Sequence, residues 1–186
     1  MQKAKPGQYS YNALHGPTPI KAGDFVLVLG TGSVSIFALQ FAAAAGATVI
    51  ATSSSDDKLK IAAKHGAKHL INYNKTPNWD EEVMKITNGE GADHIIEVGG
   101  QGTLERSIKS AKTGSGYVQV IGFIASGGEA SVVFPLLVNA VTLRGISIGS
   151  VEQPVIDKVF NFDDAIAAYA YLELQKHVGK VVIKVA

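Results

Sequence analysis

The chain contains no cysteine, and this absence excludes disulfide bonds, a catalytic thiol and a zinc ion held by cysteine ligands. Any metal site would have to use histidine and carboxylate side chains. The five histidines are scattered along the sequence without a paired spacing, so we expect no metal. Charge is also scarce, since 18% of the residues are charged and the formal net charge is +1. We therefore expect neither nucleic acid nor an acidic membrane surface as a partner.

Long apolar runs are absent as well. No run reaches the about 18 residues that a membrane-spanning helix requires, and no signal peptide is recognisable, so we expect a cytoplasmic protein. The 186 residues allow one substantial domain but not two of ordinary size. Glycine, in contrast, is abundant at 20 residues, as expected for a fold with many strand-to-helix turns.

Short apolar, β-prone segments alternate with helical segments along the chain. The expected strands cover residues 25–29, 48–52, 68–72, 94–98, 117–121 and 141–148, and the expected helices residues 36–45, 55–65, 77–87 and 103–112. This alternation predicts an α/β protein with a Rossmann-type, doubly wound parallel sheet and a short strand–helix–strand tail at the C-terminus. We expect an irregular lead-in over residues 1–22, a dinucleotide-binding domain over 23–150 and the tail over 151–186.

Residues 26–35, Val-Leu-Val-Leu-Gly-Thr-Gly-Ser-Val-Ser, are typical of a buried strand that runs through a glycine turn into a helix. Gly30 permits the tight turn, and Gly32 removes a side chain where a pyrophosphate must approach the backbone. A helix that begins near Ser33 directs free N–H groups and a positive dipole end at the phosphates. Ser35 occupies the third small position, so the G-x-G-x-x-G pattern is incomplete. The segment predicts a dinucleotide site, and the alternative is a glycine turn in another kind of α/β unit.

The end of the second expected strand indicates which dinucleotide is bound. NAD sites commonly place a carboxylate about 20 residues beyond the glycines, where it binds the ribose hydroxyls. Here the chain has hydroxyl side chains, Ser53 and Ser54 among them, and Lys58 follows within reach. A site without an acid and with a nearby ammonium favours NADP(H) over NAD(H). The alternative is that the serines cap the next helix and that Lys58 is solvated.

Glu97 is a weak catalytic candidate. It ends the fourth expected strand at the crevice where ligands of open α/β sheets bind, so it could act as a base or as a ribose contact. The structural alternative is a carboxylate held by backbone N–H groups of the following loop. Ser107 and Ser115 have no recognisable base and no nucleophile elbow, so a hydrolase is not indicated.

Six motifs together resemble the medium-chain dehydrogenase/reductase superfamily, and within it the zinc-type alcohol dehydrogenase-like and quinone oxidoreductase-like enzymes. They are Gly30-Thr-Gly-Ser-Val-Ser, Ala51-Thr-Ser-Ser-Ser-Asp-Asp-Lys-Leu, Ile71-Asn-Tyr, Ile96-Glu-Val-Gly-Gly, Leu143-Arg-Gly-Ile and His177-Val-Gly-Lys-Val-Val-Ile. The resemblance runs from about Tyr11 to the C-terminus and covers the nucleotide-binding domain. The resemblance implies that the N-terminal catalytic domain of such enzymes, which carries the zinc ligands where they exist, is missing from this sequence. Ser33 also stands where the family usually has glycine.

The resemblance implies a role for each matching position. The pyrophosphate is expected at Gly30, Gly32, Ser33 and Val34, and the adenosine 2′-phosphate at Ser53, Ser54, Lys58 and Tyr73. The nicotinamide ribose is expected beside Gly99 and Gly100, and the nicotinamide ring beside Ile121, Gly122 and Phe123. The sixth strand corresponds to the one through which family members pair two nucleotide domains. Residues 151–186 correspond to the returning part of the catalytic domain.

These observations predict an NADP(H)-dependent reductase or dehydrogenase that acts without zinc on a small carbonyl, alcohol, quinone or enone. Two alternatives stay open, namely a redox-neutral isomerase or cyclase on a trimmed dehydrogenase scaffold and a non-catalytic nucleotide-binding module. A homodimer is expected, because residues 141–148 and the tail strands are apolar and β-prone, and exposed edges of this kind pair with a second copy or aggregate.

Overall fold

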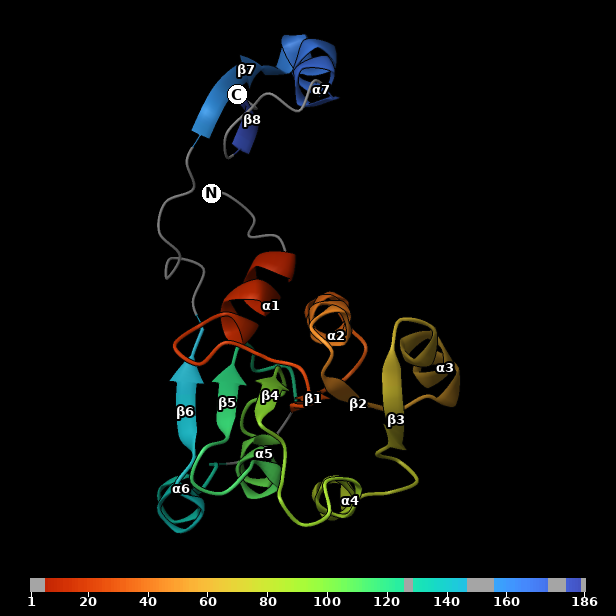
Figure 1. Cartoon of the computed structure of the whole chain (residues 1–186), viewed down its shortest axis with the longest axis vertical. Helices are drawn as coiled ribbons and strands as arrows, with labels where there is room; N and C mark the ends of the chain where they lie inside the picture. Colours follow the sequence, from red (N-terminus) through yellow and green to blue (C-terminus); the bar gives the residue numbers. More distant parts are fainter. Residues whose placement is uncertain (1–5, 126–128, 147–155, 174–179, 185–186) are drawn as a thin grey trace. The chain divides into compact units, whose positions relative to one another are not determined.

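The computed structural model describes residues 6–125, 129–146, 156–173 and 180–184 (Figure 1). The chain divides into two compact units, Met1–Ile148 and Gly149–Ala186. Part of the sixth expected strand, residues 147 and 148, lies outside the described residues, and so do residues 174–179 of the tail with His177.

The first unit contains a six-stranded sheet in which every pairing is parallel, in the order β3-β2-β1-β4-β5-β6. Its strands are β1 (Phe25–Val28), β2 (Thr48–Ser53), β3 (Ala67–Asn72), β4 (His94–Glu97), β5 (Tyr117–Val120) and β6 (Thr142–Gly145). Its helices are α1 (Pro6–Leu14), α2 (Ser33–Ala44), α3 (Asp56–Lys64), α4 (Trp79–Ile86), α5 (Leu104–Ser110) and α6 (Val133–Asn139). This is the doubly wound, Rossmann-type order, so the predicted fold class is confirmed.

Alternate side chains of the strands enter two apolar layers, one on each face of the sheet. Val26 and Val28 of β1 belong to the layer that α1, α2 and α3 cover, while Leu27 belongs to the layer that α4, α5 and α6 cover. The six strands are short and almost wholly buried at the centre, as parallel strands covered on both faces must be. Figure 1 shows α1 and α2 on one side of the sheet and α5 and α6 on the other.

The prediction of an irregular lead-in over residues 1–22 is wrong for Pro6–Leu14, which form α1. Pro6 takes the first helical position, where its missing N–H costs nothing. Ser10, Ala13 and Leu14 then follow at helical spacing and are fully buried. Tertiary packing against α2 thus stabilises a helix that the glycines and prolines of the segment disfavour.

The second unit is a strand–helix–strand element, as the sequence predicts. β7 (Ile156–Asn161) and β8 (Lys180–Lys184) are parallel neighbours, and the 3-10 turn η2 (Phe162–Asp164) and α7 (Ala165–Glu173) lie between them in the chain. Phe160 of β7 and Tyr171 of α7 pack with ring centroids 5.7 Å apart. The ammonium of Lys158 lies 4.8 Å and 4.9 Å from these two centroids, so cation–π contacts join strand and helix.

Among the described residues, no helix combines the length and the apolar character that crossing a membrane would require.

Candidate functional site

A cleft runs along the carboxyl ends of the strands at the place where the strand order reverses. It comprises two adjoining cavities of about 420 Å³ and about 500 Å³, which share Leu29, Gly30, Tyr73, Val98 and Ile124 among their lining residues. β1 has β2 on one side and β4 on the other, so the two successive crossovers diverge here. Ligands of open α/β sheets bind at such a switch point.

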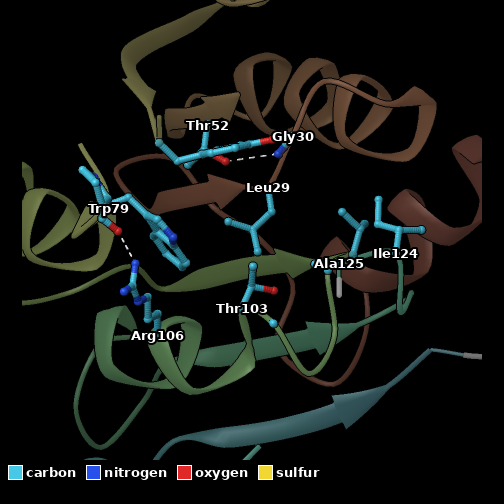
Figure 2. A pocket seen from close by; sticks show the side chains of 13 residues that line it. Leu29, Gly30, Thr52, Trp79, Thr103, Arg106, Ile124 and Ala125 are labelled. Carbon is cyan, nitrogen blue, oxygen red and sulfur yellow. Dashed lines mark hydrogen bonds between the residues drawn. The ribbon is translucent and has the colours of Figure 1, made fainter. Parts of the chain in front are cut away.

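The glycine turn after β1 forms the middle of this cleft. Gly30 has a φ of +71°, a left-handed conformation that favours glycine, and its N–H donates to Thr52 Oγ1 at 3.1 Å (Figure 2). Gly32 caps α2 in an extended conformation, and a Cβ at Gly32 would meet no protein atom within 4 Å. The first turn of α2 therefore directs N–H groups without helical acceptors at open space.

Ser35 accounts for the incomplete glycine pattern. Its side chain is buried, and its hydroxyl donates to the carbonyl oxygen of Leu29 at 2.7 Å. This bond ties the first turn of α2 to the last carbonyl of the strand region before the turn. Serine is tolerated at the third position of the glycine pattern because its hydroxyl donates a hydrogen bond to the Leu29 carbonyl, which a glycine at position 35 could not do.

One end of the cleft lies where β2 and β3 finish. It is lined by four residues that the resemblance assigns to the adenosine phosphate, namely Ser53, Ser54, Lys58 and Tyr73. No aspartate or glutamate is among the described residues that line either cavity. This end of the cleft is therefore suited to an anionic group rather than to a diol that needs a carboxylate acceptor.

The acids next to Lys58 are engaged elsewhere. Asp56 accepts a hydrogen bond from Asn72 Nδ2 at 2.7 Å and pairs with Lys75, and these contacts lower the pKa of Asp56. Asp57 pairs with Lys60 at 2.8 Å. Lys58 itself is exposed and forms no ion pair within the part of the chain that the structure describes. Its charge is thus uncompensated at the edge of the cleft.

The other end of the cleft lies where β4 and β5 finish. Ile121 and Gly122 line the larger cavity and Gly99 the smaller one, while Gly100 and Phe123 are not among the described lining residues. Gly100 has a φ of +81°, and a Cβ there would lie 2.6 Å from the Phe123 ring. Gly100 therefore lets the loop after β5 approach the loop after β4, so that these predicted positions stay close to the cleft.

The smaller cavity adds residues that sequence reasoning missed. Figure 2 shows Trp79 and Arg106 beside Leu29 and Thr103, from α4, α5 and the strand ends. Trp79 is buried, and the Arg106 guanidinium donates to the carbonyl oxygen of Pro77. No motif marks these residues, because the folding of two helices against one another brings them to the cleft.

Glu97 is part of the scaffold. Its carboxylate is fully buried, and Oε1 accepts bonds from Gly99 N at 2.7 Å, Gly100 N at 2.9 Å and Thr103 Oγ1 at 2.6 Å. Oε2 accepts a bond from the Ser107 hydroxyl. With its oxygens taken up by the following loop and α5, Glu97 fits the structural alternative better than the role of a base.

His94 lies at the opposite, amino end of the sheet. It is 2% exposed, and its Nε2 atom lies 3.6 Å from Asp24 Oδ2. Burial is the main influence on its pKa and lowers it, against the opposing effect of Asp24. His94 is therefore a packing residue remote from the cleft.

A strand-to-helix glycine turn at the switch point of a parallel sheet is typical of Rossmann domains that bind dinucleotides. The model of the zinc-binding dehydrogenase family matches residues 33–163. The chain belongs to this family and so to the medium-chain dehydrogenase/reductase superfamily. The predicted resemblance is confirmed.

Individual relatives agree with this assignment. A zinc-type alcohol dehydrogenase-like protein of Schizosaccharomyces pombe is 47% identical over 95% of this chain and 56% of that protein. A 2-haloacrylate reductase of a Burkholderia species is 28% identical over 98% of this chain and 61% of its own length. The crystal structure of an NAD-dependent alcohol dehydrogenase matches with a TM-score of 0.71 and 28% identity, over 98% of this chain and 57% of that one. The chain thus spans little more than half the length of these relatives.

A zinc ion finds no ligand set among the described residues. No group of three or more histidine, aspartate or glutamate side chains converges there, and the sequence has no cysteine. A nicotinamide dinucleotide, in contrast, fits the glycine turn and the open space beside Gly32.

Proposed function

We propose that this chain binds NADP(H) and forms the cofactor domain of a reductase or dehydrogenase for a small carbonyl, alcohol, quinone or enone. The observation that carries the proposal is the cleft at the switch point, with a glycine turn at its centre, Lys58 at one end and no carboxylate on its described lining. The bound cofactor would supply or accept a hydride. Relatives described as a 2-haloacrylate reductase and as alcohol dehydrogenases support this range of substrates.

The binding mode follows from the three parts of the cleft. The pyrophosphate would lie over Gly30, Gly32, Ser33 and Val34, where N–H groups without acceptors face open space. The adenine ring would enter the smaller, apolar cavity beside Trp79. The nicotinamide would lie at the end lined by Ile121 and Gly122, near Gly99, Gly100 and Phe123.

The preference for NADP(H) rests on charge. A 2′-phosphate near Ser53 and Ser54 would meet hydroxyl donors and the uncompensated ammonium of Lys58. A hydrogen bond between charged groups contributes about 1.5–3 kcal/mol, which corresponds to about a 10-fold to 100-fold change in affinity. NAD(H) has no phosphate at this position and gains nothing from Lys58.

A pair of lysine variants tests this proposal. Lys58→Ala should weaken NADPH binding about 10-fold or more in a fluorescence titration and leave NADH binding nearly unchanged. Lys60→Ala is the matched control, because Lys60 lies on the same helix but pairs with Asp57 and does not line the cleft. Equal losses in both variants would contradict a specific phosphate contact at Lys58.

We also propose a cytoplasmic homodimer in which β6 pairs with its counterpart. β6 has a strand neighbour on one side only within the described residues. The adjacent sequence forms α6, whose exposed apolar side chains are Val133, Phe134, Leu137 and Val138. Light scattering at micromolar concentration should give twice the 19.5 kDa chain mass, and a monomeric mass would overturn this part of the proposal.

We propose that the second unit corresponds to the C-terminal part of the catalytic domain of family members. Its described residues leave several large apolar side chains exposed within the unit, namely Val159, Phe162, Ile166 and Tyr169. Such a surface is typical of an element that packs against another part of a protein.

A further inference from the structure

Tyr9 brings a phenol to the cleft from a helix that carries no cofactor motif. It lies on α1 and lines the larger cavity together with Ile121, Gly122 and Ile124. Its hydroxyl forms no hydrogen bond within the described part of the chain. A half-buried donor without a partner, on the wall of a cavity, is available to a ligand.

The position of Tyr9 is fixed by its neighbours on α1. The next residue, Ser10, is fully buried and donates from Oγ to the carbonyl oxygen of Val34 at 2.7 Å. Arg144 of β6 donates to the carbonyl oxygen of Asn12 at 3.2 Å. α1 is thereby tied both to the first turn of α2 and to the sheet, and the Tyr9 ring packs against the apolar layer beneath them.

Tyr9 and Lys58 lie on opposite sides of β1. α1 contacts α2 and β4, whereas Lys58 follows β2 on the other side of β1. Neighbouring strands are about 4.8 Å apart, so the ends of β2 and β4 are separated by about 10 Å. A dinucleotide extended between them would place its 2′-phosphate near Lys58 and its nicotinamide on the side of Tyr9.

Several neighbours of Tyr9 at the cleft are apolar or already hydrogen-bonded. Ile121 and Ile124 are apolar, and the Ser35 hydroxyl is committed to the carbonyl of Leu29. The Glu97 carboxylate is buried and saturated by four donors. Thr31 and Ser33 also bring hydroxyl groups to the larger cavity, but they belong to the glycine turn where the pyrophosphate is proposed to bind. Tyr9 brings its hydroxyl to the same cavity from α1, outside that turn.

We propose that Tyr9 Oη donates a hydrogen bond to the oxygen of a carbonyl substrate and protonates it during reduction. This inference rests on the proposed function. A bound, reduced nicotinamide would supply a hydride with both its electrons to the carbonyl carbon, and the π electrons of the carbonyl would move to its oxygen. The oxygen takes the proton of Tyr9, and solvent water returns a proton to the phenolate. One carbonyl, one reduced cofactor and one proton thus give one alcohol and one oxidised cofactor.

Two conservative variants on the same helix test this role. Tyr9→Phe removes the hydroxyl and keeps the ring in its apolar surroundings, so the fold should be retained. Tyr11→Phe is the matched control, because Tyr11 is 53% exposed, stacks on His15 with ring centroids 4.2 Å apart and does not line the cleft. Thermal unfolding should be the same for both variants.

The first measurement is binding rather than turnover. An unreactive aliphatic carboxamide offers the same carbonyl acceptor, and its affinity for the complex with NADPH can be followed by fluorescence. Tyr9→Phe should weaken it about 5-fold to 10-fold, the usual effect of one lost hydrogen bond, while NADPH affinity stays unchanged. The second measurement is NADPH oxidation with a panel of carbonyl compounds, where Tyr9→Phe should lower kcat about 100-fold or more.

The outcomes separate the two proposals. If the native chain binds no NADPH, the proposed function fails and the role of Tyr9 fails with it. If the native chain binds NADPH and Tyr9→Phe matches Tyr11→Phe in carboxamide affinity, the role of Tyr9 alone is overturned. Weaker carboxamide binding confined to Tyr9→Phe supports it.

Discussion

The amino and carboxyl edges of the six-stranded sheet both collect polar groups, but they use them differently. At the amino edge, Asp24 accepts a bond from Lys21 N at 2.9 Å, and Asp93 accepts one from Phe25 N at 2.9 Å. At the carboxyl edge, the first N–H groups of α2 have no helical acceptor, and the Lys58 ammonium and the Tyr9 hydroxyl have no partner among the described residues. The carboxyl edge thus presents donors at a cleft, where a ligand can take them up.

Glu97 also lies at the carboxyl edge, but its carboxylate already accepts four hydrogen bonds. Its carboxylate organises the loop after β4 by accepting the N–H groups of Gly99 and Gly100. The carboxyl edge therefore combines a rigid, internally bonded support with open donors around it, as a binding site that is formed before its ligand arrives requires.

The largest effect is expected at Gly32. Gly32→Val should abolish binding of either cofactor, because its side chain would fill the space that the pyrophosphate needs, while the extended backbone of Gly32 accepts a branched residue. Far-ultraviolet circular dichroism should stay unchanged. Gly145→Val is the control, since a Cβ there also meets open space but outside the cleft. Normal cofactor binding by the Gly32 variant would break the account of the turn.

A large loss of stability is expected at Glu97. Glu97→Gln replaces an acceptor for four donors by a group that can accept only some of them, so the free energy of unfolding should fall by about 2–4 kcal/mol. Urea denaturation measures this. Glu90→Gln, at an exposed ion pair with Lys112, should cost about 1 kcal/mol or less. A Glu97 variant that keeps its stability and loses activity would instead indicate a base.

The smallest effect is expected at the amino edge, where substitution of His94 should change how the free energy of unfolding depends on pH. Burial lowers the pKa of His94 below its ordinary 6.5, so the unfolded chain binds this proton more readily than the folded one. Stability should therefore be complete above pH 6.5 and fall as the pH drops below it, by at most about 1.4 kcal/mol per pH unit. His94→Gln should flatten this slope, whereas His15→Gln, at an exposed position, should not. If both variants kept the same dependence of stability on pH, His94 would not be its source.

The alternation of strands and helices could be predicted because parallel strands buried on both faces leave continuous apolar runs between glycine turns. The helix α6 could not be predicted, because Val133, Phe134 and Pro135 have low helix propensity. Pro135 is tolerated because it lies in the first turn, where its missing N–H has no helical acceptor.

The candidate site divides in the same way. Gly30, Gly32 and Lys58 could be predicted because a turn and a charge at fixed spacing leave a local pattern. Tyr9 and Arg106 could not, since only the packing of α1 on α2 and of α4 on α5 brings them to the cleft. Local motifs therefore predict the glycine turn and the cation at the cleft, while the other walls of the cleft depend on contacts between distant segments.

We propose that the open donors of the carboxyl edge bind a phosphorylated dinucleotide. Calorimetric titration of the native chain with NADPH and with NADH tests it most directly, with both cofactors measured in the same buffer. The account predicts about 10-fold or greater affinity for NADPH, through the charge of Lys58. Equal affinity for the two cofactors, or no binding of either, would contradict it.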